Sequence, residues 1–119
     1  MTAVLVVEDE PLTASAGSCA LAEAGYEVET AACAEDAYAK LATEPRSFDA
    51  VVTDVNLGPG DHGFAVAARA RLLNPAVQVA FMTGRPENLG VFDPAVALMF
   101  SKPFDPEELV HQLAMLVPL

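Results

Sequence analysis

Five short apolar segments alternate with longer segments of helical periodicity, and this alternation constrains the fold more than any other feature of the chain. The apolar segments have the length of β-strands and occupy residues 3–7, 26–30, 49–53, 77–82 and 96–100. Strands that alternate with helices are typical of α/β proteins, in which each helix connects two parallel strands. Right-handed crossovers then predict a doubly wound parallel sheet with helices on both faces.

The second apolar segment differs from the other four. Its residues alternate, because Glu27 and Glu29 stand between Tyr26, Val28 and Thr30, whereas the other segments are nearly continuous. A strand that helices cover on both faces is apolar along its whole length, and an edge strand need not be. The sequence therefore predicts a five-stranded sheet with residues 26–30 at one edge.

Helices are expected between the strands and after the last one, at residues 11–24, 34–41 and 64–73 and from Pro106 onward. Asp105 is the expected N-cap of the last helix, because Pro106 suits the first helical position. Between residues 86 and 94, a glycine and flanking prolines leave room for a short fourth helix only.

Apolar residues at helical spacing support two of these helices. In the first helix, these residues are Leu12, Ala16, Cys19 and Ala20. In the third helix, Phe64, Ala68 and Leu72 lie on one stripe.

The chain has 119 residues, enough for one domain with its own core, and 53% apolar with 19% charged residues indicates a globular protein. The net charge of −11, from 17 acidic and 6 basic residues, disfavours direct binding to nucleic acid. No apolar segment is long enough to span a membrane, and the chain does not start like a signal peptide, so a cytoplasmic protein is expected. Cys19 and Cys33 lack metal-ligand spacing, and no chemistry is assigned to them.

Acidic and polar residues follow four of the predicted strands at the point where each ends. Taken singly they have ordinary explanations, since acids cap helices, threonines end strands and lysines lie in solvent. The carboxyl ends of parallel strands, however, meet at one edge of a doubly wound sheet, where such folds bind ligands. The sequence therefore predicts one polar site, whose candidate members are Glu8, Asp9, Glu10, Asp54, Thr83 and Lys102.

Several carboxylates at one edge repel each other unless a cation shares the site. Mg²⁺ is the favoured cation, because it prefers oxygen ligands and the site has no cluster of Cys or His. A carboxylate can also act as a nucleophile toward a phosphoryl group if metal and lysine neutralise the developing charge. The pattern thus favours Mg²⁺-dependent phosphoryl chemistry.

Four segments, VLVVEDE, VVTDVNLGPGDHGF, FMTGRP and SKPF, resemble in sequence and order the signature segments of response-regulator receiver domains of two-component signalling. The similarity spans essentially the whole chain. It implies one receiver domain over residues 1–119, of the single-domain, chemotaxis-regulator-like type, with a flavodoxin-like sheet in strand order 2-1-3-4-5. It also implies a phosphorelay switch that is not an enzyme beyond its own phosphotransfer and autodephosphorylation.

The resemblance assigns roles at the predicted site. Asp54 would accept the phosphoryl group from the phosphohistidine of a histidine kinase or a histidine phosphotransfer protein. The ligands of Mg²⁺ would be Asp9, Asp54, the backbone carbonyl of Asn56 and, through water, Glu8.

The same resemblance names the switch residues. Lys102 would pair with the phosphoryl group, and the following Pro103 would have a cis peptide bond. Thr83 would hydrogen-bond the phosphoryl oxygens and trigger the switch. The aromatic residue that usually responds to this threonine is replaced by Met99, which is apolar and has no hydroxyl.

Further departures concern the loops around the site. The loop after Asp54 is longer by one residue than in similar receivers, and it contains residues 58–63. Asn56 and Arg85 occupy the two positions that control dephosphorylation in the family, although solvation or an ion pair explains Arg85 equally well. The two histidines lack the context of phosphoryl carriers and are expected to be inert.

A phosphorylation-independent pseudo-receiver that binds a protein is the alternative, favoured if Met99 and the short fourth helix uncouple the switch. A Mg²⁺-dependent phosphatase is disfavoured, because Glu-Asp-Glu follows the first strand in place of the DxD motif of such enzymes. The downstream target is expected to be a protein. Val110, Ala114 and Val117 suggest docking of a partner or phosphorylation-dependent dimerisation. The sequence leaves open whether the chain is complete or part of a longer regulator.

Overall fold

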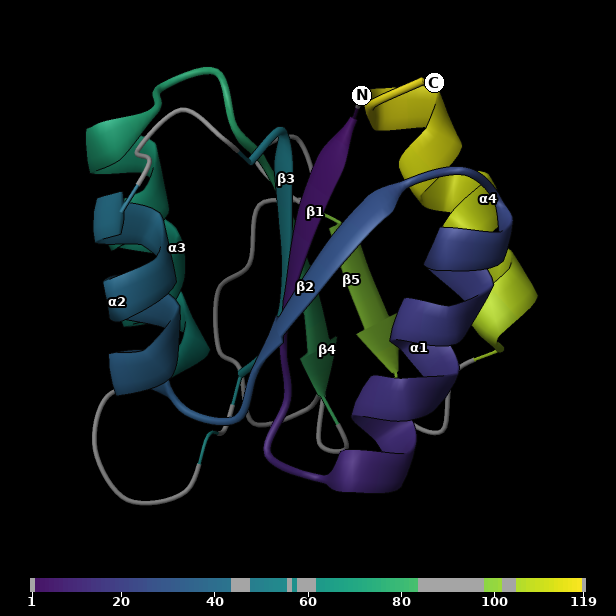
Figure 1. Cartoon of the computed structure of the whole chain (residues 1–119), viewed down its shortest axis with the longest axis horizontal. Helices are drawn as coiled ribbons and strands as arrows, with labels where there is room; N and C mark the ends of the chain where they lie inside the picture. The colour runs from purple at the N-terminus through teal and green to yellow at the C-terminus, as the bar shows by residue number, and fades with distance from the viewer. Residues whose placement is uncertain are drawn as a thin grey trace.

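The sheet lies at the centre of the molecule (Figure 1). The computed structural model describes residues 2–43, 48–55, 57, 62–83, 98–101 and 105–118. Its five parallel strands stand in the order β2-β1-β3-β4-β5, as predicted. They are β1 (Ala3–Val7), β2 (Glu27–Ala31), β3 (Ala50–Asp54), β4 (Gln78–Thr83) and β5 (Leu98–Ser101).

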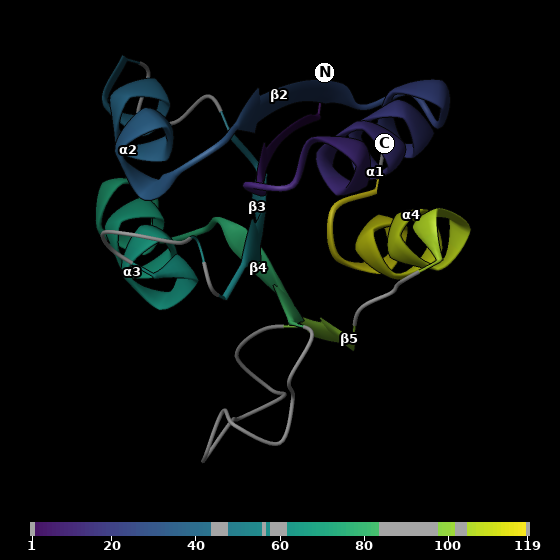
Figure 2. The ribbon, with the colours of Figure 1, turned by 90° about the horizontal axis from the view of Figure 1, so that it is seen from below.

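Helices cover both faces of this sheet. Figure 2 shows α1 and α4 on one side and α2 and α3 on the other, which is the predicted doubly wound arrangement. The helices are α1 (Pro11–Glu23), α2 (Ala34–Thr43), α3 (Gly63–Leu73) and α4 (Pro106–Leu116). The short helix predicted between residues 86 and 94 lies outside the described residues.

The strands at the centre of the sheet contribute side chains to two separate cores. In β1, Val4 and Val6 pack in the cluster that contains Leu109 and Leu113 of α4, on the side of α1 and α4. Their neighbours Leu5 and Val7 join the opposite cluster with α2 and α3. Successive side chains of a strand point to opposite faces, so a strand between two helical layers needs apolar residues throughout. Residues 26–30, by contrast, were correctly predicted to form an edge strand, and the observed strand begins at Glu27.

The apolar spacing that predicted α1 does not mark the buried side of this helix. Leu12 is 79% exposed and Cys19 is exposed, whereas Gly17 and Leu21 are the buried residues of this helix. Small alanine, serine and glycine residues lie all around α1, so apolar spacing alone does not single out one side.

The apolar spacing that predicted α3 does not mark its buried side either. Leu72 is 78% exposed and Phe64 43% exposed, while Val66, Ala67 and Ala70 are buried against the sheet. Two of these three buried residues are alanines, which contribute little to an apolar periodicity.

Local signals place the helix ends as the sequence suggested. Glu10 caps α1, because its side chain accepts a hydrogen bond of 2.7 Å from the backbone N–H of Thr13. Beyond α1 the chain turns at Gly25, whose φ of 109° suits a glycine. Asp105 caps α4 as predicted, and its carboxylate accepts from the backbone N–H of Glu107. Among the described residues, no helix has both the length and the apolarity needed to cross a membrane.

Candidate functional site

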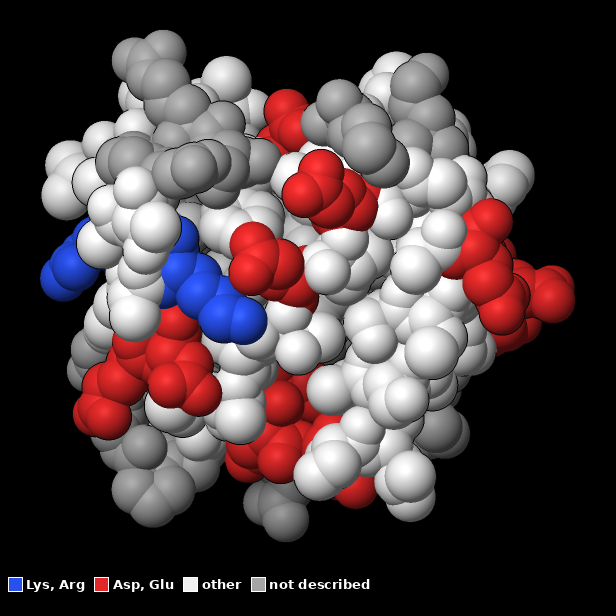
Figure 3. All heavy atoms as spheres, viewed as in Figure 1, with Lys and Arg blue, Asp and Glu red and all other residues white. Residues whose placement is uncertain are grey.

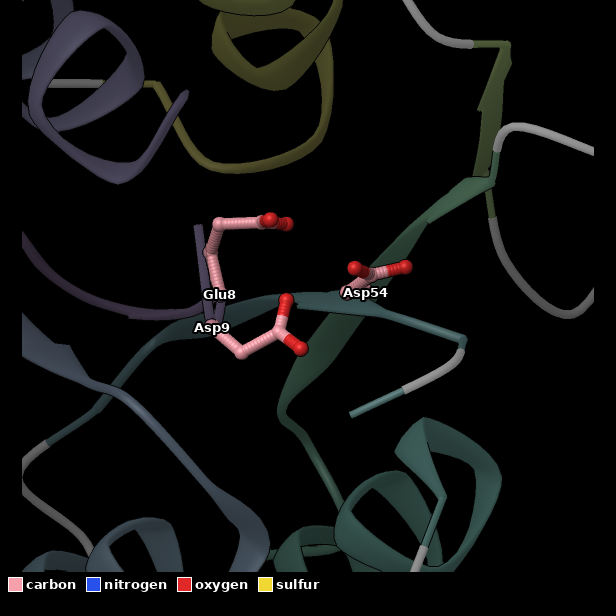
Figure 4. A group of neighbouring side chains, drawn as sticks. All are labelled: Glu8, Asp9 and Asp54. Carbon is pink, nitrogen blue, oxygen red and sulfur yellow. The ribbon is translucent and has the colours of Figure 1, made fainter. Parts of the chain in front are cut away.

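Three carboxylates meet at the carboxyl edge of the sheet (Figure 4). Glu8 and Asp9 directly follow β1, and Asp54 is the last residue of β3, which pairs with β1. One oxygen of each side chain lies within 4.8 Å of the others. Glu8 and Asp54 are buried, with 2% and 6% exposed, and Asp9 is exposed to solvent. The geometry thus places an acidic group where the sequence predicted one.

The third acid of the Glu-Asp-Glu segment has a different task. Glu8 Oε1 accepts a hydrogen bond of 3.1 Å from the backbone N–H of Glu10, which orients the buried Glu8 toward the edge. The carboxylate of Glu10 instead accepts bonds from the backbone and hydroxyl groups of Thr13 as the cap of α1. The described acidic group therefore contains Glu8 and Asp9 but not Glu10.

The main chain around Asp54 is held on both sides. Asp54 pairs in register with Met82 of β4, and the N–H of Val55 donates to the carbonyl of Met82 over 2.9 Å. The hydroxyl of Thr53 donates to the carbonyl of Asp54 over 3.0 Å. The N–H of Gly63, at the start of α3, donates to the carbonyl of Val55 over 2.8 Å and closes the loop.

Thr83 is the last residue of β4, next to the strand that carries Asp54, and its side chain is buried. In the register of the sheet it pairs with Ser101 of β5. The structure therefore brings four of the predicted site residues to one edge: Glu8, Asp9, Asp54 and Thr83.

The remaining predicted site residues are not tested by the geometry. Lys102 and Pro103 follow the end of β5 and lie outside the described residues, as do Asn56 and Arg85. Met99 is described only through its backbone, which pairs with Phe81 of β4. Their roles stay predictions.

A hollow of about 400 Å³ adjoins the acidic group on the side of α1 and β2. Glu8 and Asp9 form one end of it, and small residues of α1, among them Ala14, Ser15 and Ser18, form a wall. The hollow leaves the exposed carboxylate of Asp9 accessible from this side.

The acidic group fits a hard divalent cation. Its donors are carboxylate oxygens, and no Cys or His belongs to this group in the described part of the chain. Oxygen donors without sulfur or imidazole are the set that Mg²⁺ prefers. Three carboxylates at such short separations repel each other, and a bound cation relieves that repulsion.

The basic side chains that the structure describes belong to α2 and α3. Figure 3 shows several acidic groups on one face of the molecule and basic side chains on the side of α2 and α3. There Lys40 pairs with Glu29 at 3.9 Å, and the guanidinium of Arg69 lies 4.7 Å from the ring centroid of Tyr38. The three carboxylates of the acidic group bring like charges together at one edge of the sheet.

Two contributors to the site escaped sequence reasoning, namely Thr53 and Gly63. Thr53 reads as an ordinary strand residue, and Gly63 as one of several glycines in a polar loop. The hydroxyl of Thr53 donates to the carbonyl of the next residue, Asp54. The closeness of Gly63 to the same carbonyl depends on how α3 packs against β3, which no local pattern reveals.

Comparisons with known proteins agree with this geometry. The family model of the response regulator receiver domain matches residues 4–114. The chain therefore belongs to the response-regulator receiver family. This membership confirms the predicted family and fold class.

The relatives differ in length. The transcriptional regulatory protein TcrA of Mycobacterium tuberculosis is 37% identical over 113 residues, which cover 92% of this chain and 44% of TcrA. The chain thus spans less than half the length of that relative.

Solved structures are similar over nearly the whole chain. The response regulator TrrA from Thermotoga maritima, solved in complex with Mg²⁺ and BeF, has a TM-score of 0.83 and 28% identity, with 98% of this chain and 100% of that chain covered. The receiver domain of the hybrid histidine kinase CckA has a TM-score of 0.82 and 27% identity, with 97% of this chain and 98% of that chain covered.

Proposed function

We propose that this receiver accepts a phosphoryl group on Asp54 from a histidine kinase or a histidine phosphotransfer protein, and that the modification switches a protein-binding surface. The observation that carries the proposal is the acidic group itself. Asp54 ends a central strand, is 6% exposed, and lies with Glu8 and Asp9 in a group whose oxygens are within 4.8 Å of one another. A buried carboxylate in such a group is suited to a reaction in which a cation offsets negative charge.

Asp9 and Asp54 would hold Mg²⁺ directly, Glu8 through water, and Asn56 through its backbone carbonyl. Bound Mg²⁺ supplies charge neutralisation for the incoming phosphoryl group. The complex of TrrA with Mg²⁺ and BeF supports this choice of ion by similarity. Among the described residues, Glu8 is held for this task by its hydrogen bond from the N–H of Glu10.

In the transfer, a carboxylate oxygen of Asp54 forms a new O–P bond while the P–N bond of the partner's phosphohistidine breaks. The imidazole keeps the electron pair of that bond and takes up a proton. Lys102 would pair with the transferred group, and the buried hydroxyl of Thr83 would donate to its oxygens. The chain acts on itself here, so it is not an enzyme toward other substrates.

Modification adds charge and acceptor oxygens between β3 and β4, and the conformation that satisfies them best becomes populated. The surface near β4 and β5 would then present an altered face to a downstream protein. Dimerisation on phosphorylation, dephosphorylation control by Asn56 and Arg85, and the cytoplasmic location stay predictions from the sequence.

The test is incubation with acetyl phosphate or with the phosphoryl mimic beryllofluoride, with and without Mg²⁺. Wild type should gain one phosphoryl group by intact mass, only with Mg²⁺, and its amide spectrum should change at Thr83 and Met99. Asp54→Asn should abolish the modification, whereas Asp36→Asn, an exposed acid in the first turn of α2, should leave it unchanged.

The outcome decides between this function and its alternative. If wild type stays unmodified under conditions in which Mg²⁺ binds, the chain is a phosphorylation-independent binding module. Modification that persists in Asp54→Asn would place the acceptor elsewhere.

A further inference from the structure

We infer that Gly63 and Thr53 are positioning residues for the acidic site, because together they fix the main chain of Asp54. The inference rests on the proposed function, in that the position of Asp54 relative to Glu8 and Asp9 governs metal binding and modification. Neither residue touches the ion or the phosphoryl group; both act through the peptide unit of Asp54.

Position 63 has no room for a side chain, so a glycine is required there. A Cβ built on Gly63 would fall far inside 3.0 Å of the carbonyl oxygen of Asp54, and 2.9 Å from its carbonyl carbon. Real Cβ atoms essentially never approach other heavy atoms under 3.0 Å, and here the obstacle is main chain rather than a flexible side chain. Any side chain at position 63 must therefore move either the start of α3 or the Asp54 carbonyl.

The side chain of Thr53 contributes a hydrogen bond to the same carbonyl. Its buried hydroxyl donates to the carbonyl oxygen of Asp54 over 3.0 Å. The Cβ built on Gly63 would also lie 3.1 Å from this hydroxyl oxygen. The glycine and the threonine thus meet at one point of the main chain, and a shift of one disturbs the other.

Two further hydrogen bonds and the pairing of two strands make this arrangement stiff. The N–H of Gly63 holds the carbonyl of Val55, and the N–H of Val55 holds the carbonyl of Met82 in β4. Asp54 itself pairs with Met82 in the sheet register. The start of α3 is therefore tied through Val55 to two strands, with the peptide unit of Asp54 between them.

The functional consequence follows from the geometry of the acidic group. Its oxygens lie within 4.8 Å of one another, and Glu8 and Asp9 are fixed independently by the end of β1. Displacing the main chain of Asp54 would widen this group on one side only. A misplacement of about 1 Å at a reacting centre costs on the order of 100-fold in rate. Mg²⁺ also demands a near-ideal octahedral arrangement of its ligands.

The experiment compares matched variants at both positions. Gly63→Ala tests whether position 63 has room for a Cβ beside the carbonyl of Asp54. Its control is Ala68→Gly on the exposed side of α3, because this change lowers the helix propensity of α3 at a distance from Asp54. Thr53→Val removes the hydroxyl at nearly constant volume, and Thr53→Ser restores it. For each folded variant, the Mg²⁺ dissociation constant is measured by calorimetric titration and the modification rate with acetyl phosphate by intact mass.

Gly63→Ala should weaken Mg²⁺ binding and slow modification by about tenfold or more, and Thr53→Val by a few-fold. Ala68→Gly and Thr53→Ser should stay within about twofold of wild type, the latter as a rescue of the hydrogen bond. A purely structural role would lower stability in Gly63→Ala but leave affinity and rate per folded molecule unchanged, which would overturn the inference. If Gly63→Ala does not fold, wild-type affinity and rate in Thr53→Val overturn it instead.

Measurements on the wild-type protein distinguish a failure of this inference from a failure of the proposed function. A wild type that binds no Mg²⁺ and is not modified removes the proposed function, and the inference with it. A wild type that is modified, beside variants that match it, removes the inference alone.

Discussion

The two ends of the sheet are built from different interactions. At the carboxyl end, β3 and β4 finish in the buried side chains Asp54 and Thr83, and buried Glu8 directly follows β1. At the amino end, neutral or exposed groups tie the layers together. The hydroxyl of Tyr26 donates to the carbonyl of Val117 over 2.9 Å, and the N–H of Ala3 donates to Asp49 Oδ2 over 2.9 Å.

Interactions that stabilise the fold without a ligand and charges that favour a bound ligand therefore lie at opposite ends of the same sheet. The amino end joins β2 to the end of α4 and β1 to the residue before β3 by bonds that need no ligand. The carboxyl end collects like charges that favour a bound cation over the empty folded state. Functional sites commonly lower the stability of the folded state locally, and interactions elsewhere in the fold offset this loss.

The largest expected effect concerns the core that supports both ends. Leu113→Ala should lower the free energy of unfolding by about 2–5 kcal/mol, because it leaves a cavity where a fully buried side chain packs with β1. Urea unfolding followed by circular dichroism measures the change. Met115→Ala on the same helix, where Met115 is 72% exposed, is the control and should lie close to wild type. Equal losses in both variants would mean that α4 does not pack as described.

The second-largest expected effect is the stabilisation of the carboxyl end of the sheet by Mg²⁺. Mg²⁺ at about 100 times its dissociation constant should raise the free energy of unfolding of wild type by about 2.7 kcal/mol relative to EDTA. Asp54→Asn should lose most of this gain, since one carboxylate of the acidic group is removed. The measurement is urea unfolding with and without Mg²⁺ at constant ionic strength. A gain of the same size with Na⁺ alone, or one that survives in Asp54→Asn, would contradict a specific cation site.

The strand ends of the acidic site were predictable from the sequence. Asp54 and Thr83 each close an apolar segment of strand length, and parallel strands carry their carboxyl ends to one edge. Strand periodicity is a strong signal when strands are buried on both faces, as β3 is along its whole length. The parallel topology then brings residues that are distant in sequence close together, because they follow neighbouring strands at the same edge of the sheet.

The helix faces and the supporting contacts were not predictable in the same way. Leu12 and Leu72 are exposed, whereas the buried sides of α1 and α3 mix glycine and alanine with single larger residues, Leu21 and Val66, and so give a weak periodic signal. Gly63 carries no local signal for its contact with Asp54, since that contact depends on the tertiary approach of helix and strand. Glu10 looked like a member of the acidic group and serves as a helix cap, a choice set by its hydrogen bonds with Thr13.

The smallest expected effect belongs to the amino end and should be independent of Mg²⁺. Tyr26→Phe removes the hydrogen bond to the carbonyl of Val117 and should lower the free energy of unfolding by about 0.5–1.5 kcal/mol. The loss should be the same in Mg²⁺ and in EDTA, because Tyr26 lies at the opposite end of the sheet from the acidic group. Paired urea titrations of wild type and variant in the two buffers measure it, and a loss that depends on Mg²⁺ would show that the two ends are coupled.

The pH dependence of this loss gives a second, independent measurement. Burial raises the pKa of Tyr26 above its ordinary value of 10.0. In the unfolded chain this tyrosine ionises first, so its contribution to stability is complete below about pH 10 and declines as the pH rises through the folded-state pKa. Tyr26→Phe removes that decline. The difference in stability between wild type and variant should therefore be constant from pH 7 to about pH 9 and shrink above pH 10, and a difference that grows with alkaline pH would contradict a neutral, buried Tyr26.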